Sequence, residues 1–117
     1  MYSEHELLHT LIEATLKNRL QWTTDITNAQ QSIEEMRGND IVVTFYYEKK
    51  QATFALFYNV ETELVRLVLF DVNGDWLYEI DSEDEQDGTL IATLFDVASR
   101  QMSGVAAIVQ SVIHDFS

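Results

Sequence analysis

Seventeen consecutive residues, LVRLVLFDVNGDWLYEI (Leu64–Ile80), decide the fold class. Two runs rich in valine, leucine and aromatic residues flank Asn73-Gly74, the dipeptide that most strongly predicts a tight β-hairpin. A two-residue turn at this dipeptide fixes the pairing of the two strands. The expected cross-strand pairs are Leu69 with Tyr78, Leu67 with Ile80, and Arg66 with Asp81.

Both faces of this hairpin carry apolar side chains. One face has Leu67, Leu69, Trp76, Tyr78 and Ile80, and the other has Val68, Phe70 and Leu77. An antiparallel hairpin with one face in water would alternate apolar and polar residues. Two interpretations follow: either the hairpin is buried on both sides, or one of its faces is reserved for a partner.

The residues before this hairpin extend the β pattern toward the N-terminus. Ile41–Tyr47 and Ala52–Val60 are rich in β-branched and aromatic residues. The polar stretch Glu48–Gln51 between them is typical of a hairpin loop. The sequence therefore predicts a sheet of four antiparallel strands, at 41–47, 52–60, 64–70 and 76–80.

Two helices are predicted before the sheet. Glu4–Leu20 has Ser3 as its N-cap and apolar residues at three- and four-residue spacing. A shorter helix is expected over Ile26–Met36, ending at Gly38. The residues expected to face the core are Leu8, Leu11, Ile12, Leu16 and Leu20 in the first helix, and Ile26, Ala29, Ile33 and Met36 in the second.

A long helix is predicted after the sheet. Asp87 or Thr89 is expected to cap it, the helix is expected to reach about Phe116, and Ser103-Gly104 is the place where it would kink or split. The apolar stripe is Ile91, Leu94, Ala98, Met102, Val105, Val109, Val112 and Phe116, widened by Leu90, Phe95, Val97 and Ile108. A stripe this broad indicates burial on more than one side.

This order of elements predicts the α+β class. The N-terminal and C-terminal helices are expected to pack together on one face of the antiparallel sheet. The chain has no proline and no Pro/Gly/Ser-rich linker, so residues 1–117 are interpreted as a single α+β domain.

Net charge excludes several classes of partner. Twenty Asp and Glu against seven Lys and Arg give a formal net charge of −13. Direct binding to nucleic acid or to an anionic membrane is not expected, because both require a basic surface. No stretch approaches the length of apolar residues that spans a bilayer, and the N-terminus is acidic where a secretory signal would be basic. A cytoplasmic location is therefore expected.

Acidic residues are concentrated between residues 61 and 87. This stretch holds ten acids and one base, Arg66, and so carries a local net charge of −9. One interpretation is that the acidity only keeps the protein in solution. The other is that it forms a surface for a basic protein partner, with aromatic residues as anchors. The candidate partner-binding residues are Glu61, Glu63, Asp75, Trp76, Tyr78, Asp81, Glu83, Asp84, Glu85 and Asp87, and the further candidate anchors are Tyr47 and Tyr58.

One motif points to metal chemistry. His5-Glu6-Leu7-Leu8-His9 spells H-E-x-x-H on a predicted helix, where both histidines could ligate zinc and Glu6 could polarise a water. These five residues resemble the zinc-binding motif of the zincin metallopeptidases. That resemblance implies a small zinc-dependent hydrolase, but a third ligand is not identified: Glu34, Glu35 and His114 are the remaining candidates. The alternative is that His5 and His9 flank the apolar stripe of a surface helix.

Other catalytic or cofactor sites have little support. Asp71–Asp75 contains the spaced acids of a calcium loop but has neither the glycine nor the glutamate that an EF-hand requires, so we interpret it as a turn. No cysteine is present, no serine lies in a nucleophile motif, and no glycine-rich phosphate loop occurs. No cofactor is expected.

In its order of elements and its charge, the chain resembles small acidic α-β-β-β-α proteins of bacteria and phages, among them immunity proteins and inhibitors of host defence. The resemblance implies a non-enzymatic protein that blocks a basic site on a partner. The leading hypothesis is therefore a protein-binding module of this kind. The zinc hydrolase is the second hypothesis, and a structural homodimer formed through the apolar faces of the last helix or the hairpin is the third.

Overall fold

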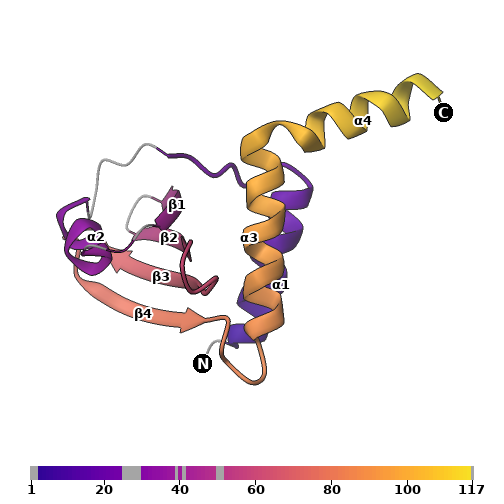
Figure 1. The fold of residues 1–117 in the computed structure, drawn as a ribbon. Coiled ribbons are helices and arrows are strands. Elements are labelled where there is room, and N and C mark those ends of the chain that lie inside the picture. The colour runs from indigo at the N-terminus through magenta and orange to yellow at the C-terminus, as the bar shows by residue number, and fades with distance from the viewer. Residues whose placement is uncertain (1–2, 25–29, 39, 41, 50–51, 117) are drawn as a thin grey trace.

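The computed structural model describes residues 3–24, 30–38, 40, 42–49 and 52–116. They form two helices, a four-stranded sheet and two further helices (Figure 1). The elements are α1 (Glu4–Leu16), α2 (Gln30–Arg37), β1 (Val42–Lys49), β2 (Ala52–Asn59), β3 (Val65–Asp71), β4 (Trp76–Asp81), α3 (Gly88–Ser103) and α4 (Val105–Phe116). The predicted α+β class and the four strands are confirmed. In the described part of the chain, no helix has the length and apolar character needed to cross a bilayer.

The sheet is an antiparallel meander in the order β1-β2-β3-β4. The predicted pairs of the β3–β4 hairpin are confirmed: Leu69 faces Tyr78, Leu67 faces Ile80, and Arg66 faces Asp81. The turn itself differs from the prediction, because the backbone N–H of Asp71 donates to the carbonyl of Asp75 and the loop therefore has three residues. A bulge after Leu69, where Phe70 pairs with Trp76, absorbs the extra residue and restores the register.

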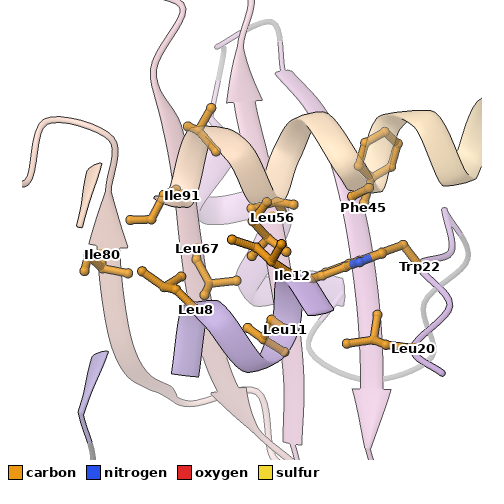
Figure 2. Packing of buried hydrophobic residues seen from close by; sticks show 13 residues of the cluster. Leu8, Leu11, Ile12, Leu20, Trp22, Phe45, Leu56, Leu67, Ile80 and Ile91 are labelled. Carbon is orange, nitrogen blue, oxygen red and sulfur yellow. The ribbon is translucent and has the colours of Figure 1, made fainter. Parts of the chain in front are cut away.

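Helices cover both faces of this sheet (Figure 1). α1 and α3 pack side by side on one face. Their apolar side chains meet those of the four strands in one buried cluster: Leu8, Leu11, Ile12, Leu20, Trp22, Phe45, Leu56, Val65, Leu67, Ile80, Ile91, Leu94 and Ala98 (Figure 2). The predicted pairing of the N-terminal and C-terminal helices on one face is thus confirmed.

α2 packs on the opposite face. Its Ile33 and Met36 join a second, smaller cluster with Ala55, Phe57, Val68 and Phe70 of the sheet. Because β3 contributes to both clusters, it is buried on both sides, which accounts for its continuous apolar sequence. The predicted core residues Ile26 and Ala29, and the predicted strand residue Ile41, lie outside the described residues.

The first helix is shorter than predicted. It ends at Leu16, where the Lys17 N–H donates to the carbonyl of Glu13. Asn18 then adopts a left-handed conformation (φ 60°) and reverses the chain. Leu16 is consequently 67% exposed, contrary to its predicted burial, whereas Leu20 and Trp22 re-enter the core from the following segment. Asparagine tolerates this conformation better than most residues, so the helix can stop there.

The side chain of Gln101 on α3 holds this reversal in place. Its amide nitrogen donates to the carbonyl of Leu20 (2.7 Å) and to Asn18 Oδ1 (3.2 Å). Its amide oxygen accepts from the backbone N–H of Trp22 (2.8 Å). The indole N–H of Trp22 donates to Thr15 Oγ1 (3.0 Å), so both N–H groups of this buried tryptophan have a partner within the protein.

The last predicted helix is split, as the Ser103-Gly104 signal indicated. Gly104 takes a left-handed conformation (φ 79°), ends α3 and turns α4 away from the sheet (Figure 1). The predicted burial of the stripe along α4 is wrong, because Val109, Val112 and Phe116 are all exposed. The projecting helix is consistent with a radius of gyration of 14.7 Å, against about 13 Å for a compact chain of this length.

Candidate functional site: an acidic end of the sheet

The loop after β4 brings acidic residues together by means of its own carboxylates. Asp81 Oδ1 accepts from the backbone N–H of Glu83 (2.9 Å), and Asp84 Oδ1 accepts from those of Gln86 and Asp87 (3.0 and 2.8 Å). Such Asx turns let a carboxylate replace backbone partners and shape a tight loop. Asp81 and Asp84 therefore build the loop as well as charging it.

Ser82 fastens this loop to the start of β3. Its backbone N–H donates to the carbonyl of Val65 (2.8 Å), and its hydroxyl oxygen accepts from the N–H of Val65 (3.0 Å). Val65 follows directly after the turn between β2 and β3. The acidic loop and that turn consequently lie next to each other at one end of the sheet.

The turn between β2 and β3 contributes two more glutamates. Asn59 Oδ1 accepts from the backbone N–H groups of Glu61 and Thr62 (2.9 and 3.1 Å), which bends the chain there. Glu63 adopts a left-handed backbone conformation (φ 61°), a strained state for glutamate that glycine would occupy more easily. Both glutamates are exposed, and the apolar side chain between them and β2, Val60, is 47% exposed.

Six carboxylates thus gather at one end of the sheet, and this group is called the acidic end. Its members are Glu61, Glu63, Asp81, Glu83, Asp84 and Glu85. The nearest arginine in sequence, Arg66, lies opposite Asp81 in the β3–β4 pair, but its guanidinium donates to Glu79 Oε1 (3.1 Å) and lies 5.5 Å from the ring centre of Phe57. No lysine or arginine occurs between Arg66 and Arg100. The acidic end therefore carries a concentrated negative field.

Other predicted site residues are not part of this group. Asp75 and Trp76 are exposed at the opposite end of the β3–β4 hairpin, about 20 Å away along β3. Tyr78 lies midway along β4 and packs against the main core cluster. Tyr47 of β1 and Tyr58 of β2 also pack against that cluster. The ten predicted residues are thus divided between the two ends of the sheet and the core.

Asp87 is buried and has a structural role rather than a place on the acidic surface. It is only 5% exposed, and its Oδ1 lies 3.2 Å from Nδ1 of His5 in the first turn of α1. Asp87 also precedes α3 as its N-cap residue, without a side-chain capping bond. α1 and α3 both begin at this end of the molecule (Figure 1). The contact between Asp87 and His5 therefore joins the acidic loop to α1.

Gly88 fixes how closely the loop folds back on α3. A Cβ atom built at this position would lie 2.3 Å from the backbone oxygen of Ser82 and 2.9 Å from its carbonyl carbon. Both distances are far inside van der Waals contact, so only glycine fits here. In the sequence Gly88 is one of four glycines, and its neighbouring residues do not indicate that the backbone of Ser82 lies so close to it.

The two histidines of the H-E-x-x-H motif lie together on α1. Their ring centres are 4.5 Å apart in an edge-to-face arrangement, and His5 faces Asp87 as described above. The suggested third ligands are far from them: Glu34 and Glu35 belong to α2 on the other face of the sheet, and His114 belongs to the projecting α4. Within the described ranges, no group of three or more His, Asp and Glu side chains is placed to hold a metal ion. A catalytic zinc usually has three protein ligands.

Comparison of the chain with protein-family models, with curated proteins and with solved structures found no match.

Proposed function

We propose that this chain is a non-enzymatic protein-binding module whose acidic end docks on a basic surface of a partner, in the manner of an inhibitor or an immunity or anti-defence protein. The observation that carries the proposal is the convergence of Glu61, Glu63, Glu83 and Glu85 with the two loop-building aspartates. These residues come from two separate turns, and hydrogen bonds between the loop and β3 hold the turns together.

Placing like charges side by side on a folded surface costs free energy unless something compensates. A surface selected only for staying in solution would disperse its charges instead of fixing six carboxylates on two short turns. The strained backbone of Glu63 supports the same view, because local strain tends to persist at functional sites. A basic partner would relieve the repulsion, and the negative field would speed the encounter.

The partner can be sought by affinity capture from a lysate of the native host, with the bound proteins identified by mass spectrometry. Between about 0.1 M and about 1 M salt the Debye length falls from about 10 Å to about 3 Å. We expect one dominant partner with a basic surface at the lower salt and its loss at the higher salt. A partner retained equally at both concentrations would contradict binding through the acidic end.

A further inference from the structure

α4 is an apolar helix whose described side chains, from Ile108 onward, are left uncovered by the rest of the domain. Five large apolar side chains recur along it at three- and four-residue spacing, and all are exposed: Ile108 by 65%, Val109 by 48%, Val112 by 51%, Ile113 by 54% and Phe116 by 88%. The exposed residues Ser111, His114 and Asp115 complete its described surface. A stripe of this spacing forms one face of a helix and is normally buried against another element.

The charge of the segment limits what can cover it. Residues 101–113 contain no charged side chain, in a chain whose formal net charge is −13. A basic protein would find one carboxylate to pair with on the whole of α4, that of Asp115 in its last turn. A membrane surface is also a poor match, because helices that lie on membranes carry lysine and arginine on their polar face. The occupant must therefore be apolar and uncharged in its contact area.

A second copy of α4 meets both requirements. Two strongly acidic chains can approach each other only where neither presents charge, and residues 101–113 are such a place. The acidic end lies at the start of α1 and α3, whereas α4 leaves from the far end of α3 (Figure 1). Pairing through α4 consequently keeps the two acidic ends apart and leaves both accessible.

We propose that two copies of this chain associate as a two-fold dimer in which the apolar stripes of their α4 helices pack against each other. In a two-fold interface the same patch serves on both copies, so a self-complementary apolar stripe suffices. The area is small. Five side chains exposed to this extent present roughly 400 Å² per copy, so the pair buries about 800 Å² in total, less than the roughly 1,000 Å² of a stable specific interface. A weak dimer, with dissociation in the micromolar range, is therefore expected.

Sedimentation equilibrium of the full chain tests the pairing over concentrations from about 1 µM to about 300 µM, a range that brackets a weak interface. We expect the mass to rise from 13.5 kDa to twice that value. The variant Val109→Glu/Val112→Glu should stay at 13.5 kDa throughout, corresponding to a loss of affinity of at least 100-fold. The control Ser111→Glu adds a charge to the same helix outside the apolar stripe and should dimerise within threefold of the unmodified chain.

Several results would overturn the pairing. The unmodified chain could remain monomeric at the highest concentration, or the double variant could dimerise as well as the control. A mass that grows beyond the dimer would contradict a closed two-fold pair. Failure of the double variant to fold at about 1 µM would show that the stripe belongs to the core. A monomer that instead sediments with phosphatidylcholine vesicles would assign α4 to a lipid surface.

Two further measurements separate this dimer from binding at the acidic end. Because the contact is uncharged, the dimer should persist at about 1 M salt, where screening weakens the acidic interaction. The chain contains no cysteine, so a single nitroxide label can be placed on α4 by Ser111→Cys. Pulsed electron resonance should then give a distance of roughly 20–30 Å between the copies, since packed helices lie 8–10 Å apart. A label at Thr93→Cys on α3 should give no such short distance, and equal distances from both labels would overturn the pairing.

Discussion

Replacing Gly88 with alanine is expected to cost about 3 kcal/mol of unfolding free energy, because forcing an extra methyl group into a packed position costs this much. The new Cβ would meet the backbone oxygen of Ser82 at 2.3 Å, and a backbone group cannot swing aside as a side chain can. Ser82 is hydrogen-bonded to the backbone of Val65, so the strain would pass to the start of β3 and to the acidic loop. Urea unfolding at 25 °C, followed by tryptophan fluorescence, measures the loss.

Gly38→Ala is the matched control. Unlike Gly88, Gly38 has a positive φ of 55°, but an added Cβ would meet nothing within 4 Å. Its replacement should therefore cost only the strain of a left-handed residue, about 1 kcal/mol. Equal losses at the two positions would show that the close approach of Ser82 to Gly88 does not determine the stability of the loop.

The second large effect is expected at Gln101. In Gln101→Leu the volume is nearly kept, but the N–H of Trp22 and the carbonyl of Leu20 lose their partner. Both residues are only 4% exposed, so water replaces the bonds poorly, and each unsatisfied buried group costs about 1–3 kcal/mol. We therefore expect a loss of about 2–4 kcal/mol in the same unfolding experiment.

Gln31→Leu serves as the control for this change, because Gln31 is exposed on α2 and its described hydrogen bond is a long one, to Glu35 at 3.4 Å. Its replacement should alter the unfolding free energy by no more than about 0.5 kcal/mol. If Gln101→Leu were equally mild, the segment between α1 and Trp22 would not depend on α3 for its backbone hydrogen bonds.

The strongly patterned parts of the chain could be predicted from the sequence. Alternating and continuous apolar runs around Asn73-Gly74 indicated the hairpin and its register, and Gly104 indicated the break between α3 and α4. The register was correct although the turn was not. A three-residue loop followed by a bulge produces the same cross-strand pairs as a two-residue turn does, from Leu69 with Tyr78 back to Arg66 with Asp81.

The wrong predictions concern the burial of helix residues. The periodicity of apolar residues shows which residues share a helix face, but not where the helix ends or what packs against that face. Leu16 and Leu20 fit one helical stripe, and only the left-handed Asn18 between them shows that the helix has ended. Likewise, the spacing of Val109, Val112 and Phe116 predicts an apolar face but says nothing about which surface covers it. Their exposure follows from the left-handed Gly104, after which α4 leaves the sheet.

The candidate site was predictable in composition but not in arrangement. Charge counting over residues 61–87 identified the acidic residues, whereas the division between the two ends of the sheet follows from the direction of each strand. Counting also could not distinguish acids with structural roles from acids that only present charge. Asp81 and Asp84 accept loop hydrogen bonds and Asp87 is buried beside His5, while Glu83 and Glu85 are exposed.

The most direct measurement of the central claim compares two variants of equal net charge in capture of the partner at about 0.1 M salt. The test variant is Glu61→Gln/Glu63→Gln/Glu83→Gln/Glu85→Gln, which keeps all the loop-building aspartates. The control is Glu13→Gln/Glu34→Gln/Glu35→Gln/Asp96→Asn, which changes four exposed acids on α1, α2 and α3. Removing four negative charges brings the formal net charge of either variant from −13 to −9.

If the acidic end is the binding surface, the test variant should lose affinity by at least about 100-fold, since each desolvated charge pair contributes on the order of 1 kcal/mol or more. The control should stay within about threefold of the unmodified chain, because long-range attraction alone is weakly affected at this ionic strength. Equal affinities of the two variants would contradict the account, since net charge rather than the acidic end would then govern binding.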